Sequence, residues 1–348
     1  MDNLKVDYSS FENAVHYDFD GDYLPLWNSL FSIGHKKVVT SNQIIPEDFN
    51  KSIDKKVDYE NCVLDILLKD RSTNRNIIWA TNDYSHLKLD YKAECEIVIS
   101  SMAGLIQSRT AKEQSAQTHR IRDKAEVFTP SWICNEQNNL IDNQWFGQKD
   151  VFNTQLFKSW ETNPQKVPFS NGKTWKDYVD ARRLEITCGE APYLVSRYDS
   201  VTGEIIDIKN RIGILDRKMR VVNENTDVFE DWWNWTQRAY QSTYGYEYQG
   251  DNLLIARKNL LYTFVDNLKH KFYREPDISE LKKIATIISW NIWQMDGITC
   301  TVPLSGPNDL VVQLSLFEPI KVNEGKSCKI KDWRSKVIVE YATLLRGQ

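Results

Sequence analysis

The chain has 348 residues, 41% of them hydrophobic and 26% charged, so it can bury one large core or one core with a smaller lobe. No stretch approaches the roughly 20 apolar residues of a membrane-spanning helix, and the first residues lack the basic start and apolar run of a secretion signal. A cytoplasmic protein without a membrane association is therefore predicted. The net charge of −4 argues against a surface that binds polyanions over its whole area.

The six cysteines form no CxxC pair, and the five histidines lack metal-ligand spacing. Neither a disulfide framework nor a metal site is predicted.

Residues 1–106 are predicted to form a small, mainly β lobe. Apolar runs at 62–68 and 77–80 flank the turn-rich residues 69–76, a pattern typical of a β-hairpin, and residues 95–106 look like another strand.

Residues 107–180 are predicted to be a helical connector. A helix is expected to begin at Thr129-Pro130-Ser131, because proline suits the first turn and threonine or serine can cap exposed amides. Residues 107–124 are the most basic stretch of the connector. If the chain binds DNA alone, its candidate contacts are Arg109, Lys112, Arg120, Arg122 and Lys124. A solvated connector between lobes is the alternative.

From residue 181 onward, strand-like and helix-like patterns alternate, which predicts an α/β domain with a parallel sheet. The expected strands are 184–187, 244–248 and the end of 278–298, and the expected helices include 192–199, 227–243 and 251–272. Three tryptophans at 232, 233 and 235 favour a helix that buries an aromatic face, with stacking on extruded bases as the alternative. Ligands of such sheets bind beyond the carboxyl ends of the strands.

Three residues stand at those predicted ends. Gly189 follows the first strand, where it lets the backbone approach a ligand and a following helix would offer amides to an anion. Its loop is neither GxGxxG nor the GxxxxGK(S/T) phosphate loop, which excludes a nucleoside triphosphate site. Glu247 and Asp296 end the next two strands, where carboxylates can accept hydrogen bonds from ribose hydroxyls and from an exocyclic amine. An ordinary turn glycine and two surface acids are the alternative.

Segments 125–141, 184–199, 244–261 and 291–298 together resemble the ordered motifs of S-adenosylmethionine-dependent DNA adenine-N6 methyltransferases. The resemblance covers about residues 107 to 300 and is strongest to the modification subunits of restriction systems. It implies a Rossmann-like methyltransferase domain at 181–348, S-adenosylmethionine as cofactor and DNA as substrate.

The resemblance also implies roles for individual residues. Phe128, Thr129 and Pro130 match the family's TP segment, which lies against the methionine end of the cofactor. The family loop DPACGSG aligns with residues 185–191, which assigns the methionine portion to Glu185, Cys188 and Gly189. Glu247 matches the ribose acid and Asp296 the acid that contacts adenine.

Several positions depart from the family pattern. Glu185, Ile186 and Ala191 replace Asp, Pro and Gly, and Glu190 adds a negative charge beside the cofactor's carboxylate, so weak cofactor affinity is expected. The family's catalytic motif, a polar residue followed by two prolines and an aromatic residue, is absent, and the chain has no PP pair. The domain is expected to be incomplete after its third strand. Cytosine C5 methylation would need a thiolate nucleophile in a loop after the cofactor strands, and Cys300 is the only thiol near that position. The ordinary interpretation of Cys300 is a cysteine packed in a strand.

Two functions follow from this. The chain is a methyltransferase component of a restriction-modification or phage-defence system whose protein partner supplies the base-binding loop, or it is a catalytically inactive relative kept as a DNA-binding or assembly subunit.

Overall fold

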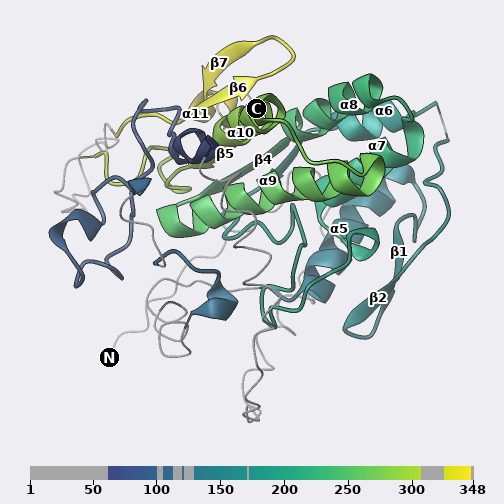
Figure 1. Ribbon diagram of the computed structural model, residues 1–348, viewed down its shortest axis with the longest axis horizontal. Helices are drawn as coiled ribbons and strands as arrows, with labels where there is room; N and C mark the ends of the chain where they lie inside the picture. The colour runs from purple at the N-terminus through teal and green to yellow at the C-terminus, as the bar shows by residue number, and fades with distance from the viewer. Residues whose placement is uncertain are drawn as a thin grey trace, which may run out of the picture. The chain divides into compact units, whose positions relative to one another are not determined.

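A parallel sheet lies at the centre of the compact unit that the structure describes. The computed structural model describes residues 62–99, 105–112, 120, 129–170, 172–306 and 325–345, all within one compact unit, Asp58–Gln348. The sheet has three strands in the order β3-β4-β5, namely Arg183–Glu185, Thr243–Glu247 and Ile292–Gln294. Figure 1 labels β4 and β5. Both pairings are parallel. The predicted α/β class with a parallel sheet is confirmed.

Pairs of helices connect successive strands. They are α7 (Ile214–Asn225) and α8 (Phe229–Gln241), then α9 (Gly250–Phe272) and α10 (Ile278–Asn291). Helices α8, α9 and α10 pack on β4 and on one another. Trp232 of α8 is fully buried and its ring lies 6.2 Å from that of Phe264 in α9, so this aromatic face forms core, as predicted.

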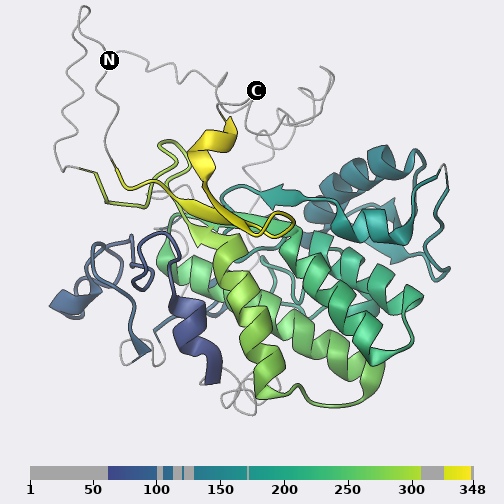
Figure 2. The ribbon, with the colours of Figure 1, turned by 90° about the horizontal axis from the view of Figure 1, so that it is seen from above.

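The opposite face of the sheet is covered by a hairpin of β6 (Lys329–Asp332) and β7 (Val337–Glu340), followed by α11 (Tyr341–Leu345). Figure 2 shows this hairpin and the helices α8 to α10 on opposite sides of the sheet. Alternate strand residues point to the hairpin and pack with Cys328 and Ile330: Tyr244, Tyr246, Trp293 and Met295. Because both faces are covered, β4 and β5 are buried along their whole length.

The described part of residues 1–106 differs from the predicted hairpin. Residues 62–68 are helical, and only isolated bridges, Lys69 to Asn76 and Ile78 to Glu96, join the residues that follow. Buried Val63, Leu64, Leu67 and Leu68 have helical spacing, which explains the difference. A short 3-10 helix follows at Leu89–Tyr91. The division into lobes at residues 106 and 180 stays a prediction.

The segment between residues 105 and 180 holds the predicted helix and an unpredicted hairpin. Helix α5 (Ser131–Phe146) begins where the Thr-Pro-Ser sequence indicated. Strands β1 (Asn153–Leu156) and β2 (Ser159–Thr162) pair antiparallel, and α6 (Trp175–Asp180) follows. Two 3-10 helices, Arg109–Ala111 and Ile208–Asn210, complete the described elements. No helix in these described segments is both long and apolar enough to cross a membrane.

Candidate cofactor site

The loop after β3 has an unusual backbone. Thr187, Gly189 and Ala191 all have positive φ angles, of 46°, 54° and 66°. The left-handed region favours glycine, and a β-branched residue such as Thr187 is rarely found there. A Cβ atom added to Gly189 would meet nothing within 4 Å, so the space beside this glycine is open.

Glu247 ties this loop to the end of β4. Its Oε2 accepts a 2.9 Å hydrogen bond from the amide of Gly189, and its Oε1 accepts a 3.0 Å bond from the amide of Gln249, just before α9. The residue is only 7% exposed. The carboxylate therefore lies between the loop and the first turn of α9, at the carboxyl edge of the sheet.

Glu185, the last residue of β3, carries a buried oxygen that lacks a partner. No hydrogen bond from the described residues reaches its Oε2. Burial raises the pKa of Glu185 well above its ordinary value, and the charge of Glu247 adds to that rise, while the amides of Tyr193 and Leu194 oppose it. This carboxyl group is suited to receive a cationic hydrogen-bond donor.

The predicted helix at 192–199 is wrong. Residues 192–194 form a turn, and the next α-helix is α7, which begins at Ile214. The carbonyls of Tyr193 and Leu194 accept hydrogen bonds from the amides of Ile214 and Leu215, so they are not available to extend a helix. The loop therefore presents no helix N-terminus to a ligand, and the amide of Gly189 is already donated to Glu247.

Glu190 does not present its charge to the loop surface as the sequence suggested. The residue is 2% exposed, its Oε1 accepts a 2.6 Å bond from the amide of Arg109, and its Oε2 accepts a 2.7 Å bond from the hydroxyl of Tyr198. Its side chain is part of a buried network that Asn259 of α9 completes.

The Thr129-Pro130 segment lies against residues 199 and 200, downstream of the loop after β3. The carbonyl of Thr129 accepts hydrogen bonds from Ser200 Oγ at 2.8 Å and from Cys134 Sγ at 3.6 Å. Asp199, rather than Thr129 or Ser131, caps α5, since its Oδ2 accepts the amide of Ser131 at 2.7 Å. Phe128 lies outside the described residues.

Cys134 in the first turn of α5 is buried, and the charge of Glu185 acts on its thiol. Burial raises the pKa of the Cys134 thiol, and the charges of Glu185 and Asp199 raise it further. The structure thus brings the TP segment and the end of β3 into one neighbourhood.

Asp296 follows β5 at the same edge of the sheet, but its side chain accepts hydrogen bonds from the turn that it begins. The amide of Met295 donates a 3.0 Å bond to the carbonyl of Glu247, which keeps the ends of β4 and β5 side by side. Asp296 Oδ1 accepts the amides of Ile298 at 2.8 Å and Thr299 at 3.3 Å. Cys300 lies in this turn rather than in a strand.

Cys188 lies beneath the loop and has a structural role. It is 2% exposed, and a Cβ added to Gly245 of β4 would lie 3.4 Å from its Sγ. Burial raises the pKa of the Cys188 thiol. A thiol in this position packs the loop onto the sheet, and its assignment to the methionine portion of a cofactor stays a prediction.

The basic stretch turns inward where the structure describes it. Arg120 is 3% exposed, and its Nη1 lies 2.7 Å from Oδ2 of Asp251 in the first turn of α9. Lys112 Nζ lies 3.3 Å from the same oxygen, and the hydroxyl of Tyr84 donates to it at 2.8 Å. Arg120 is therefore not the exposed cation expected from the sequence, because a buried carboxylate engages it.

The structure describes one of the three remaining basic candidates. Arg109 is partly exposed in the 3-10 helix Arg109–Ala111, and Arg122 and Lys124 lie outside the described residues. No sequence pattern indicated the contacts that Tyr84 and Asp251 make with these cations, apart from an acid in the first turn of a predicted helix.

Within the described residues, no group of three or more His, Cys, Asp or Glu side chains could hold a metal ion. Comparisons with protein-family models, with curated proteins and with solved structures found no match.

Proposed function

We propose that the chain is the cofactor-binding component of an S-adenosylmethionine-dependent DNA adenine-N6 methyltransferase, with a Rossmann-like domain at its centre. In this proposal it acts in restriction-modification or phage defence. The observation that carries the proposal is the buried Glu185 Oε2 without a partner, beside Glu247 at the carboxyl edge of a parallel sheet.

The side chains at this edge suit the cofactor's chemical groups. The α-ammonium group of S-adenosylmethionine can satisfy Glu185, since it is a cation with three donors. Glu247 stands at the end of β4, where a carboxylate would accept hydrogen bonds from ribose hydroxyls. Asp296 would face the adenine, and Thr129 with Pro130 the methionine end.

Methyl transfer would draw on both the cofactor and a partner. When bound, S-adenosylmethionine supplies an electrophilic methyl group. This chain would bind and orient that cofactor. The open space beside Gly189 would admit the methionine portion of the cofactor. The chain lacks the polar-Pro-Pro-aromatic sequence that would hold a flipped adenine, so the proposal assigns that loop to a protein partner.

A catalytically inactive assembly or DNA-binding subunit is the second candidate. It is favoured by the hydrogen bonds of the two acids: Glu247 already holds two backbone amides, and Asp296 closes its own turn. Acids used in this way stabilise loops even without a ligand.

Calorimetric titration separates the two candidates. The full chain is titrated with S-adenosylmethionine, S-adenosylhomocysteine and 5′-methylthioadenosine, which keeps the ribose and adenine but has no ammonium group. Glu185→Gln is expected to weaken the first two ligands by about 10-fold or more and to leave the third unchanged, because a charge-assisted hydrogen bond contributes about 1.5–3 kcal/mol.

The control is Glu94→Gln, at an exposed glutamate outside the site. Glu247→Ala should weaken all three ligands. Absence of binding by a folded wild-type sample would favour the inactive subunit.

A further inference from the structure

A concave region lies between β2 and the segment 205–210, in a part of the molecule that the proposed function does not use. It is an open groove of about 580 Å³, within the roughly 300–1,000 Å³ typical of ligand pockets. Its apolar lining comes from Trp160, Ile205 and Ile206.

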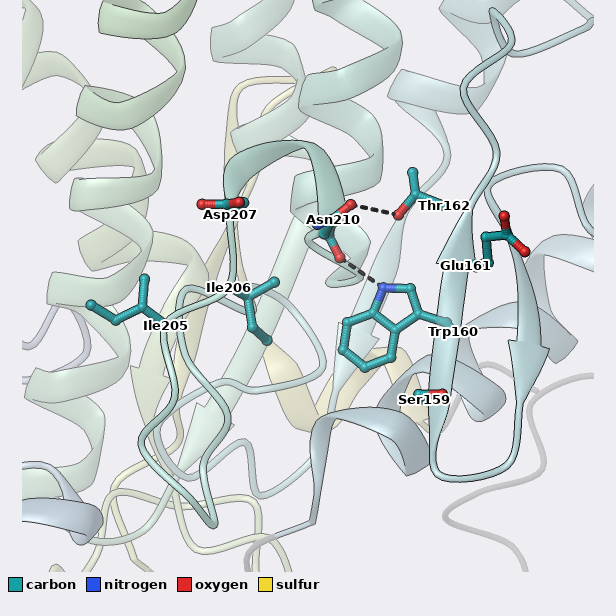
Figure 3. Close-up of a pocket in the computed structure, with 8 residues that line it drawn as sticks. All are labelled: Ser159, Trp160, Glu161, Thr162, Ile205, Ile206, Asp207 and Asn210. Carbon is teal, nitrogen blue, oxygen red and sulfur yellow. Dashed lines mark hydrogen bonds between the residues drawn. The ribbon is translucent and has the colours of Figure 1, made fainter. Parts of the chain in front are cut away.

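The aromatic floor of the groove is held in place. Trp160 Nε1 donates a 2.9 Å hydrogen bond to the carbonyl of Asn210. The hydroxyl of Thr162 donates a 3.0 Å hydrogen bond to Oδ1 of the same asparagine. Figure 3 shows the Trp160 ring reaching from β2 toward the segment that carries Ile206. A ring fixed in this way presents a preformed apolar surface, which lowers the entropic cost of binding.

One edge of the β1–β2 hairpin faces this groove. The amide of Asn163 bonds to the carbonyl of Phe152 at 2.9 Å, and the strands pair Asn153 with Thr162 through Leu156 with Ser159. Inter-strand bonds alternate along an antiparallel pair, so the main-chain groups of Trp160 and Thr162 point away from β1. An exposed strand edge of this kind can pair with an extended segment of another chain.

The rim of the groove is acidic. Glu161 and Asp207 are exposed, and neither forms an ion pair with another described residue. In Figure 3 their carboxylates stand on opposite sides of Trp160. No basic side chain lines the groove, and Lys158 stands at the hairpin tip, 5.5 Å from the ring centroid of Phe157. This charge repels a nucleic-acid backbone and complements a cationic partner.

The apolar surface extends beyond the groove. Ile205 is 56% exposed and Phe157, at the hairpin tip, is 90% exposed. Exposed apolar side chains next to a concave site with a polar rim are typical of protein-interaction surfaces.

We propose that this groove docks an extended segment of a protein partner with alternating basic and apolar residues. The segment would pair with the free edge of β2, place an apolar side chain on Trp160 and Ile206, and bring lysine or arginine side chains to Glu161 and Asp207. The proposal does not depend on cofactor binding.

Fluorescence anisotropy of the full chain with a labelled probe peptide of alternating lysine and valine tests this. Saturable one-to-one binding is expected, with at least about 10-fold weaker affinity for a peptide with glutamate in place of lysine. The double variant Glu161→Lys with Asp207→Lys should lose about 10-fold or more in affinity. The matched control, Asp90→Lys with Glu94→Lys, reverses two exposed acids outside the groove and should stay within about twofold of wild type.

Two further probes test the binding mode. A peptide with N-methylated alternate amides should bind weakly, because it cannot pair with the β2 edge, and a central photo-reactive residue should cross-link to 159–162 or 205–210. Cross-links that map elsewhere, equal binding of the glutamate peptide, or no binding of the lysine peptide at about 1 mM would overturn the proposal. A DNA duplex that binds in its place and is released by Phe157→Ser would do so as well.

Discussion

The amide of Gly189 donates a 2.9 Å hydrogen bond to Oε2 of Glu247, so a single carboxylate joins the loop after β3 to the end of β4. The same side chain accepts the amide of Gln249 at 3.0 Å. Hydrogen bonds to a charged group contribute about 1.5–3 kcal/mol each, so this acid fixes both segments whether or not a ligand is present.

Two glycines of this region should respond differently to substitution by alanine. Gly189→Ala should cost only about 1–2 kcal/mol of unfolding free energy, because the positive φ of 54° is unfavourable but a Cβ has open space. Gly213→Ala should cost about 3 kcal/mol or more, since its Cβ would lie 2.4 Å from the carbonyl oxygen of Leu194. Urea denaturation of the two variants measures the difference, and equal losses would contradict these backbone positions.

Glu185→Gln should change how stability depends on pH. Burial raises the pKa of Glu185, so the native state favours its protonated form. Its contribution is complete below the ordinary value of 4.5 and is lost as pH rises toward the native value. Glutamine stays neutral at every pH. The unfolding free energy of the variant should therefore rise relative to that of the wild type by up to about 1.4 kcal/mol per pH unit above about pH 4.5.

Denaturation at a series of pH values checks this, with Glu94→Gln as the exposed control. A constant difference between Glu185→Gln and wild type across the series would show that Glu185 ionises normally in the native protein.

The elements that the sequence predicted well are those whose pattern is local. α9 has a long apolar repeat, and its last turn carries Lys269, His270 and Lys271 where the helix dipole favours cations. β4 and β5 are short segments with aromatic residues that lie between helices, a pattern that indicates buried parallel strands.

The features that were missed depend on distant partners. The position of residues 192–199 after a strand and a turn predicted a helix, but the carbonyls of Tyr193 and Leu194 accept the amides of Ile214 and Leu215 instead. The charge of Arg120 suggested a surface site, and only the fold shows that Asp251, 131 residues away, buries it. The unpartnered Glu185 oxygen is likewise a property of packing that no spacing rule could show.

Arg257 should be a major contributor to stability. It is fully buried in α9 and donates to the carbonyls of Ile292 at 2.8 Å and Lys69 at 3.1 Å, and also to that of Leu67. Burial lowers its pKa to about 9. Arg257→Met leaves these buried carbonyls unsatisfied and should cost about 3 kcal/mol or more.

Arg71→Met is the comparison for Arg257. Arg71 is half-buried and donates one 2.8 Å bond, to Ser289 Oγ, so about 1 kcal/mol is expected. Similar losses in the two variants, measured by urea denaturation, would refute the role assigned to Arg257.

The ion pair of Arg120 and Asp251 gives the sharpest test of where the basic stretch lies. Burial alone would raise the pKa of Asp251, but the charges of Lys112 and Arg120 and the hydrogen bonds from Arg120 and Tyr84 lower it overall. A carboxylate with a depressed pKa stabilises the fold above its ordinary value of 3.8, and this contribution is lost as pH falls below that value. Asp251→Asn should therefore cost about 3–5 kcal/mol at neutral pH, with a gap that narrows below about pH 4.

Arg120→Met should show a comparable loss at neutral pH, because it leaves part of the Asp251 charge buried without its closest cation. Arg75→Met is the matched control, since Arg75 pairs with Glu96 at 2.6 Å but its side chain is 71% exposed, and a surface pair contributes about 0–1 kcal/mol. Denaturant titrations at pH values from about 3 to 7 compare the three variants with wild type. If Arg120 instead lay on the surface as a DNA contact, Arg120→Met would resemble Arg75→Met in stability and would reduce the salt dependence of DNA binding.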